Sequence, residues 1–163
     1  MKIFGKRLSE YIAFEKWFLI LVLVVGLLRL ELSILGVSNS ADRYLSLTVL
    51  LLLGLVYYSI KVHTSGFGSY LQLLPVLALQ WIVAQAVVIA GIAISIQTGK
   101  DNIYSAPEFS PGKVSGRTWA HALSHLVVMI VMPLIAWAIG SLLMFATKKA
   151  TGGRPQKAGA AQA

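Results

Sequence analysis

The stretch WFLILVLVVGLL, residues 17–28, holds no charged side chain and decides the class of protein. An α-helix that crosses a bilayer core of about 30 Å needs roughly 20 consecutive, mainly apolar residues. Further long apolar blocks follow along the chain. The sequence therefore predicts four transmembrane helices, at about 11–30, 44–62, 70–97 and 118–147.

The composition excludes an ordinary soluble domain. Of the 163 residues, 57% are hydrophobic and 12% are charged, and the mean hydropathy is +0.77. An average soluble domain carries about 25% charged residues. The chain has no cysteine, which excludes disulfides, thiolate metal sites and cysteine catalysis. We expect an all-α polytopic membrane protein: one four-transmembrane-helix bundle over 1–147, then a disordered, basic cytoplasmic tail over 148–163.

The limits of the first span are ambiguous. Residues 1–10 are basic, like the n-region of a signal peptide, but no small-residue cleavage pattern follows the apolar run, so we expect a retained helix. A span over 17–37 would bury Arg29 and Glu31 in the membrane. We favour a span over 11–30, because it leaves both ionisable groups at the outer interface.

The basic residues predict that both termini are cytoplasmic (N-in, C-in). In this orientation nine basic residues lie inside: Lys2, Lys6, Arg7, Lys16, Lys61, Lys148, Lys149, Arg154 and Lys157. Five lie outside: Arg29, Arg43, Lys100, Lys113 and Arg117. The excess follows the positive-inside rule. The net charge of +8 therefore suits anionic lipid headgroups better than nucleic acid, and the pattern fits a bacterial inner membrane.

The stretch RTWAHALSH, residues 117–125, places two histidines at the start of the last span. In a helix His121 and His125 share one face, and Met129 and Met132 continue it. Imidazole with thioether suits copper, and imidazole with carboxylate suits zinc or iron, so His121, His125 and Met129 are candidate metal ligands. The two histidines point the same way and cannot sandwich one haem, which leaves a haem with one histidine and one methionine ligand or with a single histidine ligand. A polar collar with packing methionines explains the same pattern without any ligand.

Two glutamines of the third span are expected to join helices. Gln80 and Gln85 lie deep in this span, where an amide group needs a partner. We interpret both as helix–helix polar contacts. Ser69 and Gln72 match the capping box that opens a helix.

Two pairs of small residues and one proline predict how the helices pack and bend. Two pairs are spaced four residues apart and allow close helix approach, within the chain or between subunits: Ala86 with Ala90, and Ala136 with Gly140. Pro133 predicts a kink in the last helix.

The sequence holds no Walker A, Gly-x-Gly-x-x-Gly or Gly-x-Ser-x-Gly motif. We expect a non-enzymatic accessory, scaffolding or oligomerising subunit of a membrane complex. Its partners would be the lipid bilayer and other membrane subunits or further copies of itself. The alternative is a copper-, zinc- or haem-binding redox or transport protein with its site at His121 and His125. A third hypothesis is an enzyme that binds a lipid or quinone in the same outer pocket.

Overall fold

The structure, a computed structural model, describes residues 2–37, 45–109 and 114–152. Its long helices are α1 (Leu8–Ile34), α3 (Leu47–Thr64), α4 (Tyr70–Thr98) and α5 (Trp119–Ala150). A hairpin of β1 (Lys2–Ile3) and β2 (Lys6–Arg7) precedes α1, and a 3-10 helix, η1 (Pro107–Phe109), lies between α4 and α5. All four long helices are long and apolar enough to cross a membrane. The predicted all-α fold with four membrane-crossing helices agrees with this architecture.

The helix limits differ from the predicted spans mainly at the ends. Helix α1 extends over 8–34 and so overlaps both alternatives for the first span. Helix α5 continues to Ala150, so Lys148 and Lys149 form its last turn instead of belonging to the tail. Lysines are favourable there because the C-terminus of a helix carries a partial negative charge. Residues 153–163 of the predicted tail lie outside the described residues.

Local hydrogen bonds explain where three of the helices begin. At the start of α4 the Ser69 amide donates to the Gln72 side-chain oxygen at 2.8 Å, which confirms the predicted capping box. The Ser46 hydroxyl accepts from the Val49 amide at the start of α3. The Thr118 hydroxyl accepts from the His121 amide at the start of α5.

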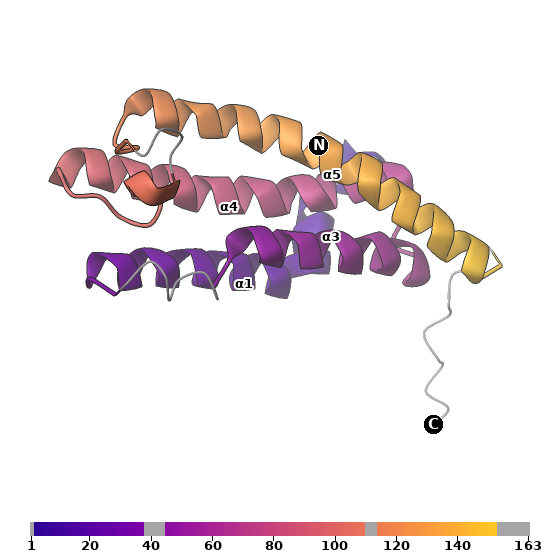
Figure 1. The fold of residues 1–163 in the computed structure, drawn as a ribbon. Coiled ribbons are helices and arrows are strands. Elements are labelled where there is room, and N and C mark those ends of the chain that lie inside the picture. Colours follow the sequence, from indigo (N-terminus) through magenta and orange to yellow (C-terminus); the bar gives the residue numbers. More distant parts are fainter. Residues whose placement is uncertain (1, 38–44, 110–113, 153–163) are drawn as a thin grey trace.

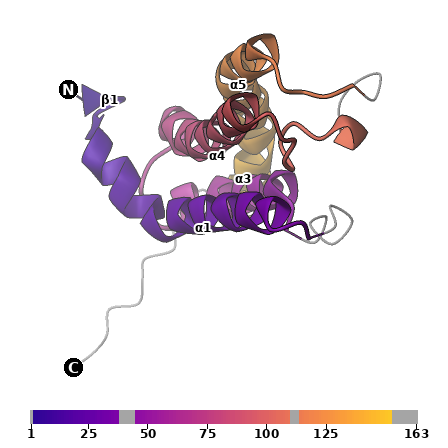
Figure 2. The same ribbon diagram turned by 90° about the vertical axis from the view of Figure 1, so that its left-hand side faces the viewer.

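Helix α4 lies between α5 on one side and the pair α1 and α3 on the other (Figures 1 and 2). The second half of α5 slants away from the first and reaches α3 (Figure 1). Pro133 lies in this helix, where a proline removes a backbone hydrogen bond and bends the axis. At Gly140 a Cβ atom would stand only 2.6 Å from the Ser59 hydroxyl, so Gly140 and the buried Ala136 serve contacts inside the chain.

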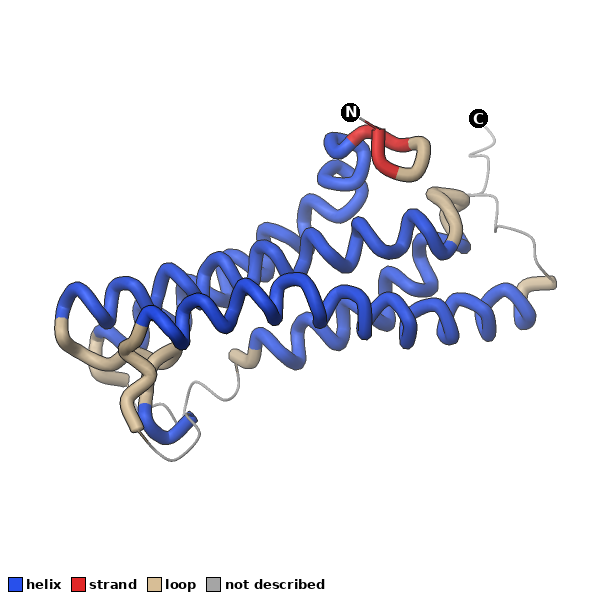
Figure 3. Tube along the Cα trace, turned by 90° about the horizontal axis from the view of Figure 1, so that it is seen from above, coloured by secondary structure: helices blue, strands red, loops and turns tan. Residues whose placement is uncertain are grey.

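The bundle has two distinct ends (Figure 3). The hairpin end carries the β1–β2 hairpin, the turn between α3 and α4, and the last turn of α5. The loop end carries the end of α1, the start of α3 and residues 99–109 and 114–118 of the connection from α4 to α5. The hairpin is bound to the bundle, because the Tyr11 hydroxyl donates to the Ile3 carbonyl and the Gln72 amide donates to the Phe4 carbonyl.

Candidate functional site

The described parts of the α4–α5 connection, residues 99–109 and 114–118, fold back onto the helices at the loop end. Asn102 and Ser105 are buried, as is Ile103 between them. The Asn102 side-chain amide donates to the Gly91 carbonyl of α4 at 2.7 Å, and the Tyr104 hydroxyl donates to the Gly26 carbonyl of α1 at 2.7 Å. Buried backbone carbonyls near a membrane core need such donors. The segment therefore acts as a structured cap that ties α1 to α4.

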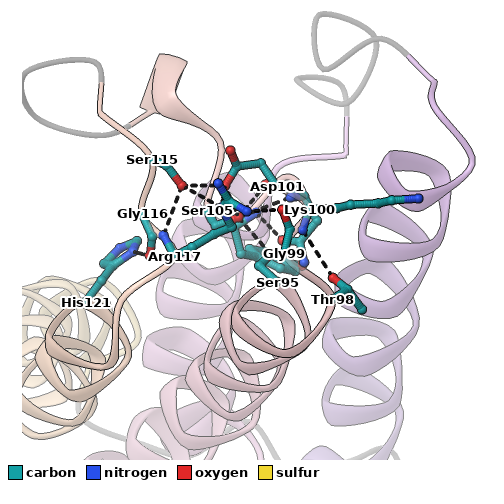
Figure 4. Close-up of polar contacts among 12 residues, drawn as sticks. Ser95, Thr98, Gly99, Lys100, Asp101, Ser105, Ser115, Gly116, Arg117 and His121 are labelled. Carbon is teal, nitrogen blue, oxygen red and sulfur yellow. Dashed lines mark hydrogen bonds and ion pairs between the residues drawn. The ribbon is translucent and has the colours of Figure 1, made fainter.

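A polar network fixes the return of this segment into α5 (Figure 4). The Arg117 guanidinium pairs with the Asp101 carboxylate at 3.1 Å and also donates to the Gly99 carbonyl. The Ser115 and Ser105 hydroxyls donate to the same carboxylate oxygen at 2.7 and 3.1 Å. Because one carboxylate holds three side chains from both sides of the loop, it sets the position at which α5 begins.

The two histidines extend this network into the bundle. His121 Nδ1 lies 2.8 Å from the Gly116 carbonyl, and its Nε2 lies 3.3 Å from His125 Nε2. His125 Nδ1 lies 2.6 Å from the side-chain oxygen of Gln85 on α4. Their spacing of four residues places the two rings on one face of α5, with ring centres 5.0 Å apart. A continuous chain of hydrogen-bonding groups thus runs from the loop to α4.

The hydrogen-bond partners determine which ring nitrogens of His121 and His125 carry a proton. The Gly116 carbonyl only accepts, so His121 carries its proton on Nδ1 and, when neutral, accepts at Nε2. His125 Nε2 then donates to His121, and a neutral His125 accepts at Nδ1. Gln85 must present its NH2 group to a neutral His125, and its oxygen to a His125 imidazolium. The orientation of the Gln85 amide therefore follows the charge on His125.

These residues line a cavity of about 270 Å³ at the loop end. Every long helix contributes to its wall, and the loop segment adds Tyr104. Its polar and aromatic lining comprises Arg29 of α1, Thr48 of α3, Trp81 and Gln85 of α4, Tyr104, and His121 and His125 of α5. The rest is apolar: Leu47, Leu51, Ala84, Val88 and Ile103. The lining of the cavity thus combines polar and apolar side chains.

Arg29 is the charged group of this cavity. Its Nε is buried and has no hydrogen-bond partner among the described residues. Its guanidinium lies 5.8 Å from the centre of the Tyr104 ring. The ion pairs of the described part of the chain join Lys6 to Glu10 and Arg117 to Asp101, so Arg29 has no carboxylate there. Arg29 as a whole is half-buried. Burying part of a guanidinium without a counter-charge is costly, and a bound anion would offset that cost.

The third candidate metal ligand, Met129, does not line the cavity with the histidines. Met129 and Met132 are deeper on α5 and do not line the cavity. The two Nε2 atoms are 3.3 Å apart, which is close to the separation of two ligands on a tetrahedral zinc with bonds of about 2.0–2.1 Å. In the described residues no group of three His, Cys, Asp or Glu side chains is placed to hold a metal. A metal at His121 and His125 stays a prediction.

Gln80 and Gln85 both hydrogen-bond to other helices, but to different partners. The Gln80 amide donates to the Glu15 carboxylate of α1 at 2.9 Å, and both side chains are 1% exposed. Gln85 faces His125 of α5. Buried Val22, Leu51 and Ala84 belong to an apolar cluster of α1, α3 and α4. Helix α4 thus serves two separate polar contacts on two different neighbours.

Sequence reasoning missed Glu15, Arg29 and Tyr104 as site residues. Glu15 had a usable signal, because it shares one helical face with Tyr11 and Val22, both fully buried. The sequence analysis placed Arg29 at a membrane interface, and Tyr104 was one residue of a long polar loop.

Comparisons with protein-family models, curated proteins and solved structures found no match to this chain. The functional argument therefore depends on the cavity itself.

Proposed function

We propose that this chain is a non-enzymatic membrane protein that binds an anionic amphiphile, by its carboxylate or phosphate group, in the loop-end cavity. The observation that carries the proposal is Arg29, whose side chain lines the cavity with a buried Nε that lacks a partner in the described residues. Guanidinium is the side chain best suited to carboxylate and phosphate, because its planar donors match their oxygens.

The remaining lining supports the same ligand class. Imidazole groups of His121 and His125 and the Gln85 amide add hydrogen-bonding groups beside the cation. Trp81 and Leu51 offer apolar surface to a hydrocarbon or ring attached to the anionic group. An amphiphile dissolved in the membrane combines these two features in one molecule.

The membrane setting of the proposal follows from the charges. We place the hairpin end in the cytoplasm and the loop end outside, because basic residues concentrate at the hairpin end. We further propose that the membrane is a bacterial inner membrane. Fusion of a reporter enzyme to the C-terminus, active only in the cytoplasm, tests the orientation.

Native mass spectrometry in a mild detergent tests ligand binding. The probes are oleate and oleyl alcohol, which share one hydrocarbon chain and differ in charge. We expect the protein to retain oleate in preference to the alcohol. Charge-assisted hydrogen bonds contribute about 1.5–3 kcal/mol, so Arg29→Gln should weaken oleate binding roughly tenfold to hundredfold.

The matched control is Arg7→Gln, which removes an exposed arginine of the hairpin. This variant should bind oleate like the unaltered protein. Equal retention of oleate and oleyl alcohol, or equal losses in the two arginine variants, would contradict the proposal.

A metal site remains the second candidate, favoured by the 3.3 Å separation of the two Nε2 atoms. Arg29 lines the same cavity, and its positive charge opposes a bound cation. Stoichiometric copper, zinc or iron in untagged protein, lost in the His121→Ala, His125→Ala double variant, would establish this alternative.

The accessory or scaffolding role stays a proposal that is compatible with ligand binding. The exposed pair Ala86 and Ala90 on α4 offers a surface for close helix approach. Replacing both alanines with leucine should abolish a complex that gentle-detergent extraction preserves. A complex that survives this change would exclude this surface as the contact.

A further inference from the structure

A second cavity, of about 300 Å³, lies between α1 and α3 and is independent of the loop-end site. Its lining combines six aromatic or aliphatic side chains with one lysine, Lys61. Lys61 lies close to the C-terminus of α3, which ends at Thr64, so the cavity belongs to the hairpin end of the bundle. We call it the Lys61 groove.

Three aromatic rings hold the Lys61 ammonium in place. It lies 5.0 Å from the centre of the Phe14 ring, 5.1 Å from that of Tyr57 and 5.4 Å from that of Tyr58. No carboxylate of the described residues lies within ion-pair distance of it. Aromatic faces attract the cation but accept no strong hydrogen bond from it, so its donors stay available to an anion.

One acidic side chain lies behind this groove. Glu15 of α1 is 1% exposed, and its carboxylate accepts a hydrogen bond from Gln80. It lies within electrostatic range of Lys61 but forms no ion pair with it. A second ammonium, that of Lys16, lies 5.1 Å from the centre of the Trp17 ring, which lines the groove. The exposed Lys16 and the half-buried Lys61 are therefore more accessible than the Glu15 carboxylate.

The Lys61 groove lies on the outer surface of the helix bundle. Trp17, Leu21 and Tyr57 of its wall are exposed, Trp17 by 77%. Exposed apolar side chains continue along the same two helices toward the loop end, among them Val24 on α1 and Leu53 on α3. In a membrane protein such a strip is the surface along which a hydrocarbon chain packs.

The charges at the hairpin end indicate which kind of lipid headgroup the groove would bind. The hairpin end carries the acids Glu10 and Glu15. The cations of the same end are Lys2, Lys6, Arg7, Lys16, Lys61, Lys148 and Lys149. This excess attracts negative lipid headgroups.

We propose that the Lys61 groove binds one anionic phospholipid of the leaflet at the hairpin end. Lys61 contacts its phosphate, and one acyl chain follows α1 and α3 past Leu21. The neighbouring His63 takes no part, because it is buried and its Nε2 lies 3.2 Å from the Thr151 hydroxyl. The site stands whether or not the loop-end cavity binds a ligand.

Native mass spectrometry with two lipids of identical acyl chains tests the proposal. Phosphatidylglycerol, which is anionic, should be retained about fivefold more than phosphatidylcholine, as expected for one well-placed lysine. Lys61→Gln should remove most of this preference, and Lys61→Arg should keep it. The control Lys149→Gln removes an exposed cation at the same end and should leave the preference unchanged.

Equal retention of the two lipids would overturn the proposal, and so would equal losses in Lys61→Gln and Lys149→Gln. A photoactivatable phosphatidylglycerol with the reactive group on its acyl chain gives a test that needs no variant. Cross-links in the segments 14–21 and 49–61 support the groove. Cross-links confined to α4 and α5 overturn it.

Discussion

A methyl group added at Gly91 of α4 would displace Tyr104, which belongs to the cap at the loop end. A Cβ atom at this position would stand 2.4 Å from Cδ2 of the Tyr104 ring, well inside van der Waals contact. The ring cannot retreat freely, because its hydroxyl is bound to the Gly26 carbonyl of α1 at 2.7 Å. Gly91→Ala must therefore push Tyr104 away from α1 and α4 together.

The free-energy change has opposing parts. Overpacking costs about 1–3 kcal/mol, and loss of the Tyr104 hydrogen bond costs about 0.5–1.5 kcal/mol. Replacing a helical glycine with alanine returns up to about 1 kcal/mol. We expect Gly91→Ala to lower the free energy of unfolding by about 1–3 kcal/mol.

A double-mutant cycle isolates this contact. In a Tyr104→Ala background the added methyl meets no ring, so Gly91→Ala should become neutral or stabilising by up to about 1 kcal/mol. The assay is unfolding in mixed micelles followed by far-UV circular dichroism. If Gly91→Ala stabilises the otherwise unaltered protein, or has the same effect in both backgrounds, the placement of Tyr104 against α4 is wrong.

Three further predictions address the other polar contacts. Glu15→Ala leaves the buried Gln80 amide without its acceptor and should lower the free energy of unfolding by about 1–3 kcal/mol. Glu15→Gln keeps a partner for Gln80 and should lower it less. Equal losses in the two variants would contradict the hydrogen bond. Thr118→Ala removes the cap of α5 and should cost about 1 kcal/mol in the same assay, and no loss would show that the cap contributes nothing. An alkyl sulfonate, which stays ionised, should bind more tightly than the alcohol of the same chain length, because the Arg29 guanidinium lines the cavity. This preference should be lost in Arg29→Gln; its persistence there would assign it to other groups.

The spans were predictable because each one depends on local composition. Twenty or so apolar residues specify a membrane helix whatever surrounds them. The capping box at Ser69 and Gln72 was predictable for the same reason, since its partners are three residues apart. The helix ends were harder, as Lys148 and Lys149 show: a basic pair reads equally well as a tail or as the last turn of a helix.

The loop-end cavity could not be predicted, because its residues are far apart in the sequence. Tyr104 reaches the carbonyl of a residue 78 positions earlier, and His125 meets a glutamine 40 positions earlier. Periodicity showed that His121 and His125 share a face, but it did not show that Arg29 lines the same cavity. That juxtaposition supports the proposed anionic ligand over the metal cation of the alternative hypothesis.

Analysis of the amphiphiles that copurify with the protein tests the central claim most directly. The unaltered protein, Arg29→Gln and Arg7→Gln are purified in the same mild detergent, and their organic extracts are compared by mass spectrometry. The account predicts an anionic amphiphile in near-stoichiometric amount with the unaltered protein and with Arg7→Gln, and its loss from Arg29→Gln. Extracts with the same content in all three proteins, or with only neutral molecules enriched, would contradict it.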